Sequence, residues 1–258
     1  MNKYPKISII TVCYNSQKTI KHTVNSVRSQ DYPNIEYIII DGLSTDWTLK
    51  ILEYYKDNID HFVSENDNGI YDAMNKGIAL SKGDIIGILN SDDFYPNNEV
   101  LSRVSKVFRE SGCDCLYGDL LYVNKGYARK IERYWKSGPF SISKLDKGWT
   151  LPHPTFFVKR SVYEKYGYYN TDLSASADYE MILRLLYNYR LNVVYMPEIM
   201  VKMRTGGESN ATIWNRLRGN NQDMKAWELN GLKSPKFLRL RKPLSKLSQF
   251  IKRPKDNE

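Results

Sequence analysis

The chain has 258 residues, of which 41% are hydrophobic, and a formal net charge of +9. No apolar run approaches the roughly 18 residues that a membrane span needs, and the N-terminus leads into a strand-like segment without a signal sequence, so we expect a cytoplasmic protein. Residues 213–258 hold 12 Lys and Arg against 4 Asp and Glu. The basic character therefore belongs to the tail, which argues against a nucleic-acid partner.

The first 112 residues alternate between β-branched runs and helical patterns. The expected strands are 6–13, 35–41, 59–64 and 84–90, and the expected helices are 17–30, 46–56, 70–81 and 98–110. Such a β/α repeat predicts a parallel sheet with right-handed crossovers. Ligands in these sheets bind at the carboxyl ends of the strands, so the residues after each strand are the first candidates for a site.

The pattern changes after about residue 113. Two strands, 115–123 and 127–134, are expected around a turn at Asn124-Lys125-Gly126, which suggests an antiparallel insertion. Further along we expect strands at 154–159 and 192–196 and helices at 160–166, 178–189 and 212–229. We therefore expect a β/α half at 1–112, a second half of the same domain at 113–212, and a tail at 213–258.

Polar residues follow the first two expected strands. Asn15 or Ser16 can cap the next helix, and so can Asp46 after the second strand, which is the simplest interpretation of these residues. Capping does not explain Asp41, which stands at the edge of the expected sheet.

The strand at 84–90 ends in Asn90-Ser91-Asp92-Asp93. Two adjacent carboxylates that leave a buried strand repel each other, and a hard cation such as Mg²⁺ or Mn²⁺ relieves that repulsion through oxygen ligands. The alternative is an acidic turn that caps the following helix. The place at the ligand edge of a parallel sheet favours the metal.

Two phosphate-binding motifs are absent: neither GxGxxG nor GxxxxGK[ST] follows the first strand. A nucleotide diphosphate would then have to be held by a metal and aspartates.

Four segments together carry a family resemblance: Thr11 to Asn15, Asp41 to Asp46, Glu65 to Gly77, and Asn90 to Asp93. In this order they resemble glycosyltransferase family 2, inverting enzymes of the GT-A fold, and in particular bacterial enzymes of O-antigen and exopolysaccharide synthesis. The resemblance covers roughly residues 5 to 200. It implies an α/β fold with a Rossmann-like, mostly parallel sheet flanked by helices, a C-terminal acceptor-binding part and, here, a basic amphipathic helical tail.

The resemblance also implies a nucleotide-sugar site. Tyr14 would lie against the base, Asp41 would accept a hydrogen bond from it, and the segment 65–77 would line the ribose and sugar. The implied set is Thr11, Val12, Tyr14, Asn15, Asp41, Ser44, Asp67, Asp72, Asn75, Lys76, Asn90, Ser91 and Asp92. Asp92 and Asp93 would bind Mn²⁺ or Mg²⁺, although Asn90 replaces the first aspartate of the D-x-D motif.

The general base implied by the resemblance is Asp178, in Ser176-Ala177-Asp178 at the start of an expected helix. The alternative is a carboxylate that only interacts favourably with the helix dipole. Family members often have an acid where this chain has Ala177, and Glu180 is a weaker substitute. His153 and Trp149 are candidates for contacts to the diphosphate or acceptor, with structural roles as alternatives.

The tail interleaves Leu and Phe with Lys and Arg over 235–254, and Pro243 predicts two short helices, the second starting at the proline. Such a segment can bind an anionic membrane surface, or else pack on the body. The resemblance implies a polyprenyl-diphosphate-linked saccharide acceptor at the inner face of the cell membrane.

The sequence thus predicts a metal-dependent enzyme that moves a hexose from a nucleotide-sugar to a lipid-linked saccharide, with UDP as the default nucleotide and GDP or dTDP as alternatives. A nucleotidyltransferase and a non-catalytic binding protein are the competing interpretations. The former usually has a Gly-rich basic loop after the first strand, which this chain lacks.

Overall fold

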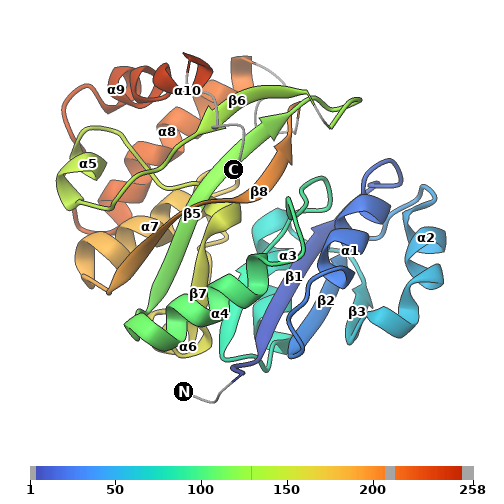
Figure 1. Cartoon of the computed structure of the whole chain (residues 1–258). Coiled ribbons are helices and arrows are strands. Elements are labelled where there is room, and N and C mark those ends of the chain that lie inside the picture. Colours follow the sequence, from blue (N-terminus) through green and yellow to red (C-terminus); the bar gives the residue numbers. More distant parts are fainter. Residues whose placement is uncertain (1–3, 129, 207–212, 252–258) are drawn as a thin grey trace.

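The computed structural model describes residues 4–128, 130–206 and 213–251. Its centre is an eight-stranded sheet in the order β3-β2-β1-β4-β7-β5-β6, with β8 beside β5 (Figure 1). The strands are β1 Ile7–Cys13, β2 Ile35–Asp41, β3 His61–Ser64, β4 Ile85–Ile88, β5 Cys115–Val123, β6 Ile131–Trp135, β7 Phe157–Lys159 and β8 Val193–Arg204.

Helices cover both faces of this sheet (Figure 1). They are α1 Ile20–Arg28, α2 Thr48–Tyr54, α3 Ile70–Leu80, α4 Val100–Ser111, α5 Ile142–Asp146, α6 Arg160–Tyr166, α7 Ala177–Ile182, α8 Ile213–Leu229, α9 Leu238–Ser245 and α10 Ser248–Ile251. Short turns of other helix types are η1 Lys56–Asn58, η2 His153–Thr155 and the π-type turn η3 Leu183–Asn188.

The parallel β/α half predicted from the sequence is confirmed. β1 pairs in parallel with both β2 and β4, and β2 pairs in parallel with β3. Alternate residues of the fully buried strand β1 enter two different cores: Ile10 packs in one and Ile9 in the other. Burial on both faces explains why these strands are continuous apolar runs instead of alternating ones.

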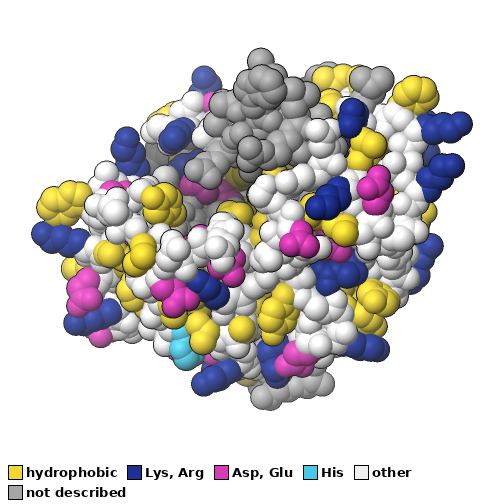
Figure 2. Space-filling view, turned by 180° about the vertical axis from the view of Figure 1, so that it is seen from behind, with side chains coloured by type: hydrophobic (Ala, Val, Ile, Leu, Met, Phe, Trp, Pro, Cys, Tyr) yellow, Lys and Arg dark blue, Asp and Glu magenta, His cyan; other side chains and the backbone are white. Residues whose placement is uncertain are grey.

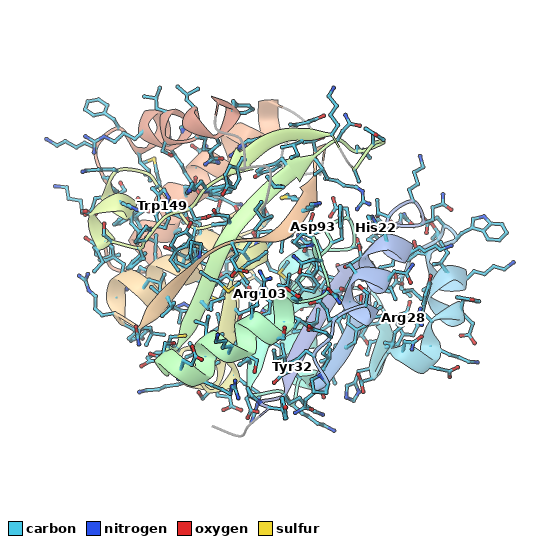
Figure 3. All side chains as sticks on the ribbon, viewed as in Figure 1. His22, Arg28, Tyr32, Asp93, Arg103 and Trp149 are labelled. Atoms are coloured by element: carbon cyan, nitrogen blue, oxygen red, sulfur yellow. The ribbon has the colours of Figure 1, made fainter. Side chains whose placement is uncertain are left out.

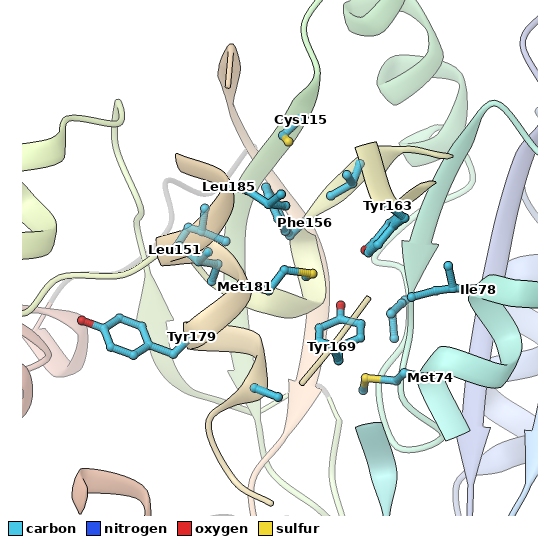
Figure 4. Packing of buried hydrophobic residues seen from close by; sticks show 14 of the residues in the cluster. Met74, Ile78, Cys115, Leu151, Phe156, Tyr163, Tyr169, Tyr179, Met181 and Leu185 are labelled. Carbon is cyan, nitrogen blue, oxygen red and sulfur yellow. The ribbon is translucent and has the colours of Figure 1, made fainter. Parts of the chain in front are cut away.

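The first core joins the two halves of the chain. Figure 4 shows Met74 and Ile78 of α3 facing Tyr163, Tyr169 and Met181 from the second half, and all five belong to one buried cluster. This packing fixes α3 relative to α7, the two helices whose first turns carry candidate site residues.

The second half differs from the expectation in several elements. The expected strand 154–159 is the turn η2 followed by the short strand β7, the expected strand 127–134 begins only at Ile131, and the expected helix 178–189 is α7 followed by η3. The longest difference is in β8. β8 runs to Arg204, well beyond the predicted end at 196, because a register shift opposite Gly118 lets the strand pass Pro197. A bulge removes the need for the N–H that proline lacks. Gly118 is required there, since a Cβ would lie 2.4 Å from the sulfur of Met200.

The tail packs on the body as helices, and one detail of its prediction is wrong. Pro243 lies inside α9 instead of starting a second helix, and the break falls at the turn of Lys246 and Leu247. Within the described part of the chain, no helix has the length and apolarity required to span a membrane.

Candidate active site

The carboxyl ends of β1, β2 and β4 meet as predicted. The N–H of Asn15 donates to Ser44 Oγ at 2.8 Å, and its side-chain oxygen accepts from the N–H of Thr45 at 2.9 Å. The hydroxyls of Ser16 and Ser91 lie 2.7 Å apart. These contacts fix the three strand ends relative to one another and form one edge of the candidate site.

Asp41 is fully buried at this edge. Its carboxylate accepts hydrogen bonds from the N–H of Ser44 at 2.9 Å, from the hydroxyl of Ser44 at 2.5 Å and from that of Ser64 at 2.7 Å. These bonds hold the turn after β2 against the end of β3. The geometry gives Asp41 a positioning role, and a contact from Asp41 to a base stays a prediction.

A more accessible carboxylate lies beside it. A Cβ added at Gly42 would stand 2.5 Å from Oδ2 of Asp67 and 3.6 Å from the ring of Tyr14. The Tyr14 side chain is 61% exposed. Gly42 has no side chain, so it leaves space between the exposed Tyr14 ring and the Asp67 carboxylate. An aromatic ring and a carboxylate around such a space suit a planar nucleobase with a polar edge. Thr11 and Val12 are buried within β1, so they can offer a ligand little beyond their backbone.

The first turns of α3 are held by polar contacts. Lys76 forms ion pairs with Glu65 at 2.8 Å and Asp72 at 3.6 Å. Asp72 also accepts from the N–H of Asn68, while Asn75 bonds both the N–H and the C=O of Tyr169. Asn75 therefore links α3 to Tyr169 in the second half of the chain. The contacts of Asp72 and Lys76 to a nucleotide-sugar stay predictions.

The turn after β4 is anchored from β8. Arg204 donates to the backbone carbonyl of Asp92 and contacts a ring nitrogen of His22, and its guanidinium lies 4.7 Å from the Phe94 ring centre. Figure 3 shows His22 and Asp93 near each other at this end of the sheet. Burial raises the pKa of the Asp92 carboxyl, and the charge of Arg204 opposes that shift.

Asp93 is the more buried of the two carboxylates that are predicted to bind the metal. It is fully buried, neither of its carboxylate oxygens has a hydrogen-bond partner in the described residues, and burial followed by the charge of Asp92 raises its pKa well above the ordinary value. Without a cation nearby, a carboxyl group in that environment favours its neutral form. The role of Asp93 as a metal ligand stays a prediction.

Asn90 and Asp92 suit a cation that takes its other ligands from the substrate. The side-chain oxygen of Asn90 is buried without a partner among the described residues, and Asp92 is partly exposed in the same turn. No group of three or more His, Cys, Asp or Glu gathers in the part of the chain that the structure describes. Mg²⁺ and similar ions often take one or two protein ligands and fill the other positions with phosphate and water oxygens.

Asp178 stands at the start of α7, partly exposed. The hydroxyl of Tyr71, from the first turn of α3, donates to its Oδ1 at 2.9 Å. Tyr71 stacks on Tyr169 with ring centres 5.6 Å apart, and the Tyr169 hydroxyl lies 2.7 Å from Nε2 of His153. Burial lowers the pKa of His153 more than the nearby Asp178 raises it, so the imidazole is neutral at pH 7.

Two of the acceptor-side candidates have structural contacts. Both carboxylate oxygens of Glu180 accept from Arg184 at 3.1 Å, and Glu180 is only 4% exposed. These contacts favour a structural role, and its contact to the acceptor or diphosphate stays a prediction. Trp149 packs against Tyr117 and Phe140 and lies apart from Asp93 in Figure 3. Its partly buried ring fits the core interpretation better than an open sugar platform.

Sequence reasoning missed three residues of the site: Tyr71, Tyr169 and Arg204. One signal existed, because Tyr71 and Asn75 are four residues apart on a helix and both contact Tyr169. Nothing local in the sequence pointed to Arg204.

These features have a counterpart in one family. Residues 8–167 match Glycosyl transferase family 2, and the chain belongs to that family. The chain is 33% identical over 186 residues to an uncharacterised glycosyltransferase of Mycobacterium tuberculosis, covering 71% of this chain and 70% of the relative. It is 28% identical over 214 residues to the PGL/p-HBAD biosynthesis glycosyltransferase of Mycobacterium bovis, with 81% of both chains covered.

Solved structures show the same fold. A fragment of S. aureus TarS in complex with UDP-GlcNAc superposes with a TM-score of 0.69 at 22% identity, over 87% of this chain and 65% of that one. The mannosyltransferase PcManGT from Pyrobaculum calidifontis, in complex with GDP-Man and Mn²⁺, superposes with a TM-score of 0.65 at 17% identity, over 88% and 64%. The chain spans less than two thirds of both structures. The protein is a glycosyltransferase of the GT-A fold, which sets aside the nucleotidyltransferase and the non-catalytic alternative.

Proposed function

We propose that this enzyme is an inverting glycosyltransferase that moves a hexose from a nucleotide-sugar to a hydroxyl of a lipid-linked saccharide in surface-polysaccharide synthesis of the O-antigen type. The observation that carries the proposal is the partly exposed Asp178, held by the Tyr71 hydroxyl at 2.9 Å. Residues 65–77, the segment that contains Tyr71, also contain Asp67, which lies beside Tyr14 and Gly42. The proposed general base and the proposed nucleotide site thus lie on either side of the start of α3.

The proposed reaction is a single displacement. Asp178 accepts the proton of the acceptor hydroxyl while that oxygen forms a bond to the anomeric carbon. The bond from this carbon to the diphosphate oxygen breaks, and the nucleoside diphosphate leaves with the electron pair. Attack on the face opposite to the leaving group inverts the anomeric configuration. Tyr71 holds the carboxylate in place throughout, because its own pKa is raised well above the ordinary value by burial and by Asp178.

Asn90 and Asp92 would hold the Mn²⁺ or Mg²⁺ ion, whose charge stabilises the diphosphate as it leaves. For the nucleotide, UDP is our first choice, supported by the UDP-GlcNAc complex of a structural neighbour. GDP is supported in the same way by the GDP-Man complex, and dTDP has the same imide edge as UDP.

We also propose that the tail lies on an anionic membrane surface at the cytoplasmic face. Four of its apolar side chains are more than half exposed: Phe237, Leu244, Leu247 and Phe250. Exposed Lys233 and Lys236 belong to the same segment, and Figure 2 shows hydrophobic and basic side chains together at its upper right, where the C-terminal helices lie. An amphipathic basic surface of this kind suits a headgroup interface, where a polyprenyl-diphosphate-linked acceptor would be found.

The test measures nucleoside diphosphate release from a panel of UDP-, GDP- and dTDP-sugars with Mn²⁺ and a membrane extract that contains lipid-linked saccharides. We expect one donor class to be turned over and Asp92→Ala and Asp178→Ala to abolish turnover. Full turnover by both variants would contradict the site assignment. Thermal shifts with UDP, GDP and dTDP identify the nucleotide independently of the acceptor.

A further inference from the structure

The two C-terminal helices α9 and α10 dock beside the catalytic half through basic residues. Nζ of Lys242 lies 2.6 Å from a carboxylate oxygen of Asp223, with side chains only 12% and 9% exposed. The same ammonium group stands 3.6 Å from the centre of the Tyr179 ring, in the residue next to Asp178. This buried ion pair fixes α9 against α7 and α8.

Arg133 of β6 forms the second part of the contact. Its guanidinium donates to the side-chain oxygen of Gln249 at 2.6 Å, and it stacks 4.4 Å from the ring centre of Tyr122 and 5.2 Å from that of Phe250. Tyr122 is the residue that pairs with Arg133 near the carboxyl end of β5. Arg133 therefore lies toward the ligand edge of the sheet, although β6 is at the opposite side from β3.

Lys246 lies in the turn between these two helices and is partly buried. Four charged groups act on its ammonium: Lys242, Arg133, Asp223 and Asp178. Burial, followed by the two neighbouring cations, lowers its pKa to about 8, and the two carboxylates oppose that shift. The backbone C=O of Lys246 accepts from the N–H of Gln249 at 3.1 Å, and the side chain of Gln249 is the one that Arg133 contacts. Lys246 is thus one turn away from the contact between β6 and α10.

Two cations in this cluster lack a matching charge. Lys242 is paired with Asp223, but neither Lys246 nor Arg133 has a carboxylate within ion-pair distance among the described residues. Partly buried like charges repel each other and lose hydration, so a bound anion would stabilise this arrangement. Planar Arg and compact Lys together are a common pair for phosphate oxygens.

We propose that Lys246 and Arg133 form an anion-binding site for the phosphate or diphosphate group of the acceptor, so that the tail completes the acceptor side of the active site. The proposal rests on the proposed function. The strand order supports it, because the nucleotide slot lies at the ends of β1 and β2 while Arg133 stands on the far edge strand β6. Lys242, one turn before Lys246, contacts the ring of Tyr179 beside Asp178, so a phosphate held at Lys246 would lie on the side of the base away from the nucleotide.

The experiment titrates the full-length protein with geranyl diphosphate, a soluble prenyl diphosphate, in EDTA so that metal-dependent binding at the donor site is silent. The variants are Lys246→Gln, Lys246→Arg and, as a matched control from the exposed part of the tail, Lys236→Gln. We expect Lys246→Gln to weaken binding about tenfold or more, and Lys246→Arg and Lys236→Gln to stay within about twofold of the wild type. Unchanged affinity in Lys246→Gln, or no binding by the wild type, overturns the proposal.

Two further measurements distinguish the acceptor site from a lipid-headgroup site and from the nucleotide site. In phosphatidylglycerol vesicles we expect Lys246→Gln and Lys236→Gln to weaken binding equally. A loss confined to Lys246→Gln with unchanged geranyl diphosphate affinity assigns the site to a lipid headgroup and overturns the proposal. Nucleotide binding with Mn²⁺ is measured in every variant. If nucleotide binding is normal but Lys246→Gln keeps its affinity for geranyl diphosphate, only the acceptor site is refuted. If the wild type binds no nucleotide, the proposed function itself is refuted.

Discussion

The hydroxyl of Tyr71 donates to Oδ1 of Asp178 at 2.9 Å, across 107 residues of sequence. The bond joins the first turn of α3 to the first turn of α7. In the proposed mechanism, a shift of one helix relative to the other would move the carboxylate away from the nucleotide, so this bond would set the distance between the donor and the base.

The first prediction concerns this pair. Asp178→Asn keeps the shape but cannot accept a proton, so we expect turnover to fall by about 10²- to 10⁴-fold with little change in nucleotide affinity. Tyr71→Phe removes only the positioning bond, and we expect about a tenfold lower kcat with an unchanged donor KM. Steady-state kinetics and melting temperatures check both variants. Equal losses in kcat and in thermal stability for Tyr71→Phe would mean that the bond only stabilises the fold.

The second prediction concerns the metal. Asn90 offers one neutral oxygen without a partner among the described residues, and a carboxylate there would add charge to the same position. We therefore expect Asn90→Asp to raise the Mn²⁺-dependent affinity for the nucleotide several-fold, and Asp92→Asn to remove most of that dependence. Calorimetric titrations of UDP with and without Mn²⁺ measure both effects. Asp93→Asn tests the other predicted ligand: an unchanged metal dependence in this variant would remove fully buried Asp93 from the metal site.

The third prediction is a loss of stability in mild acid. Burial lowers the pKa of His153, so the unfolded chain takes up a proton before the folded chain as the pH falls. Stability from this group is complete above pH 6.5 and declines below it, by at most about 1.4 kcal/mol per pH unit. Urea unfolding at pH 7.5, 6.0 and 5.0 should show a smaller decline in His153→Gln than in the wild type. An identical decline in both proteins would show that His153 protonates freely in the folded state.

The strand ends were readable from the sequence because buried parallel strands are continuous apolar runs, and polar residues such as Asn15 and Asp92 stand where those runs stop. The pairing of Glu180 with Arg184 was also readable, since the two residues are four apart on a helix, and it favours a structural role for Glu180. In contrast, the burial of Asp93 and the bond from Tyr71 to Asp178 depend on packing between distant segments, for which one sequence holds no local signal.

The fourth prediction concerns the membrane surface of the tail. Truncation at residue 234 is an unsuitable test, because it would also remove Leu238, which is 3% exposed, and Lys242, which is paired with Asp223. Leu244→Ser with Leu247→Ser changes only side chains that are 62% and 57% exposed. We expect this double variant to reduce sedimentation with phosphatidylglycerol liposomes about tenfold or more. Tyr54→Ser, at an 83% exposed position on α2, is the control, and an equal loss there would rule out the tail as the contact surface.

The fifth prediction follows from the place of Lys246 among Lys242, Arg133, Asp223 and Asp178. Its pKa of about 8 means that near pH 8 about half of the free protein has a neutral amine at this position. A bound diphosphate favours the charged form and raises that pKa, so binding takes up about half a proton. Affinity should therefore fall as the pH rises above 8.

The matched variant is Lys246→Arg, because guanidinium stays protonated throughout this range. It should bind geranyl diphosphate with nearly the wild-type affinity at pH 7 but take up no proton at pH 8, and its affinity should not fall between pH 8 and 9. Calorimetry in two buffers of different ionisation enthalpy measures the uptake directly. If wild type and Lys246→Arg took up the same number of protons, the titrating group would have to lie elsewhere, and Lys246 would not contact the anion.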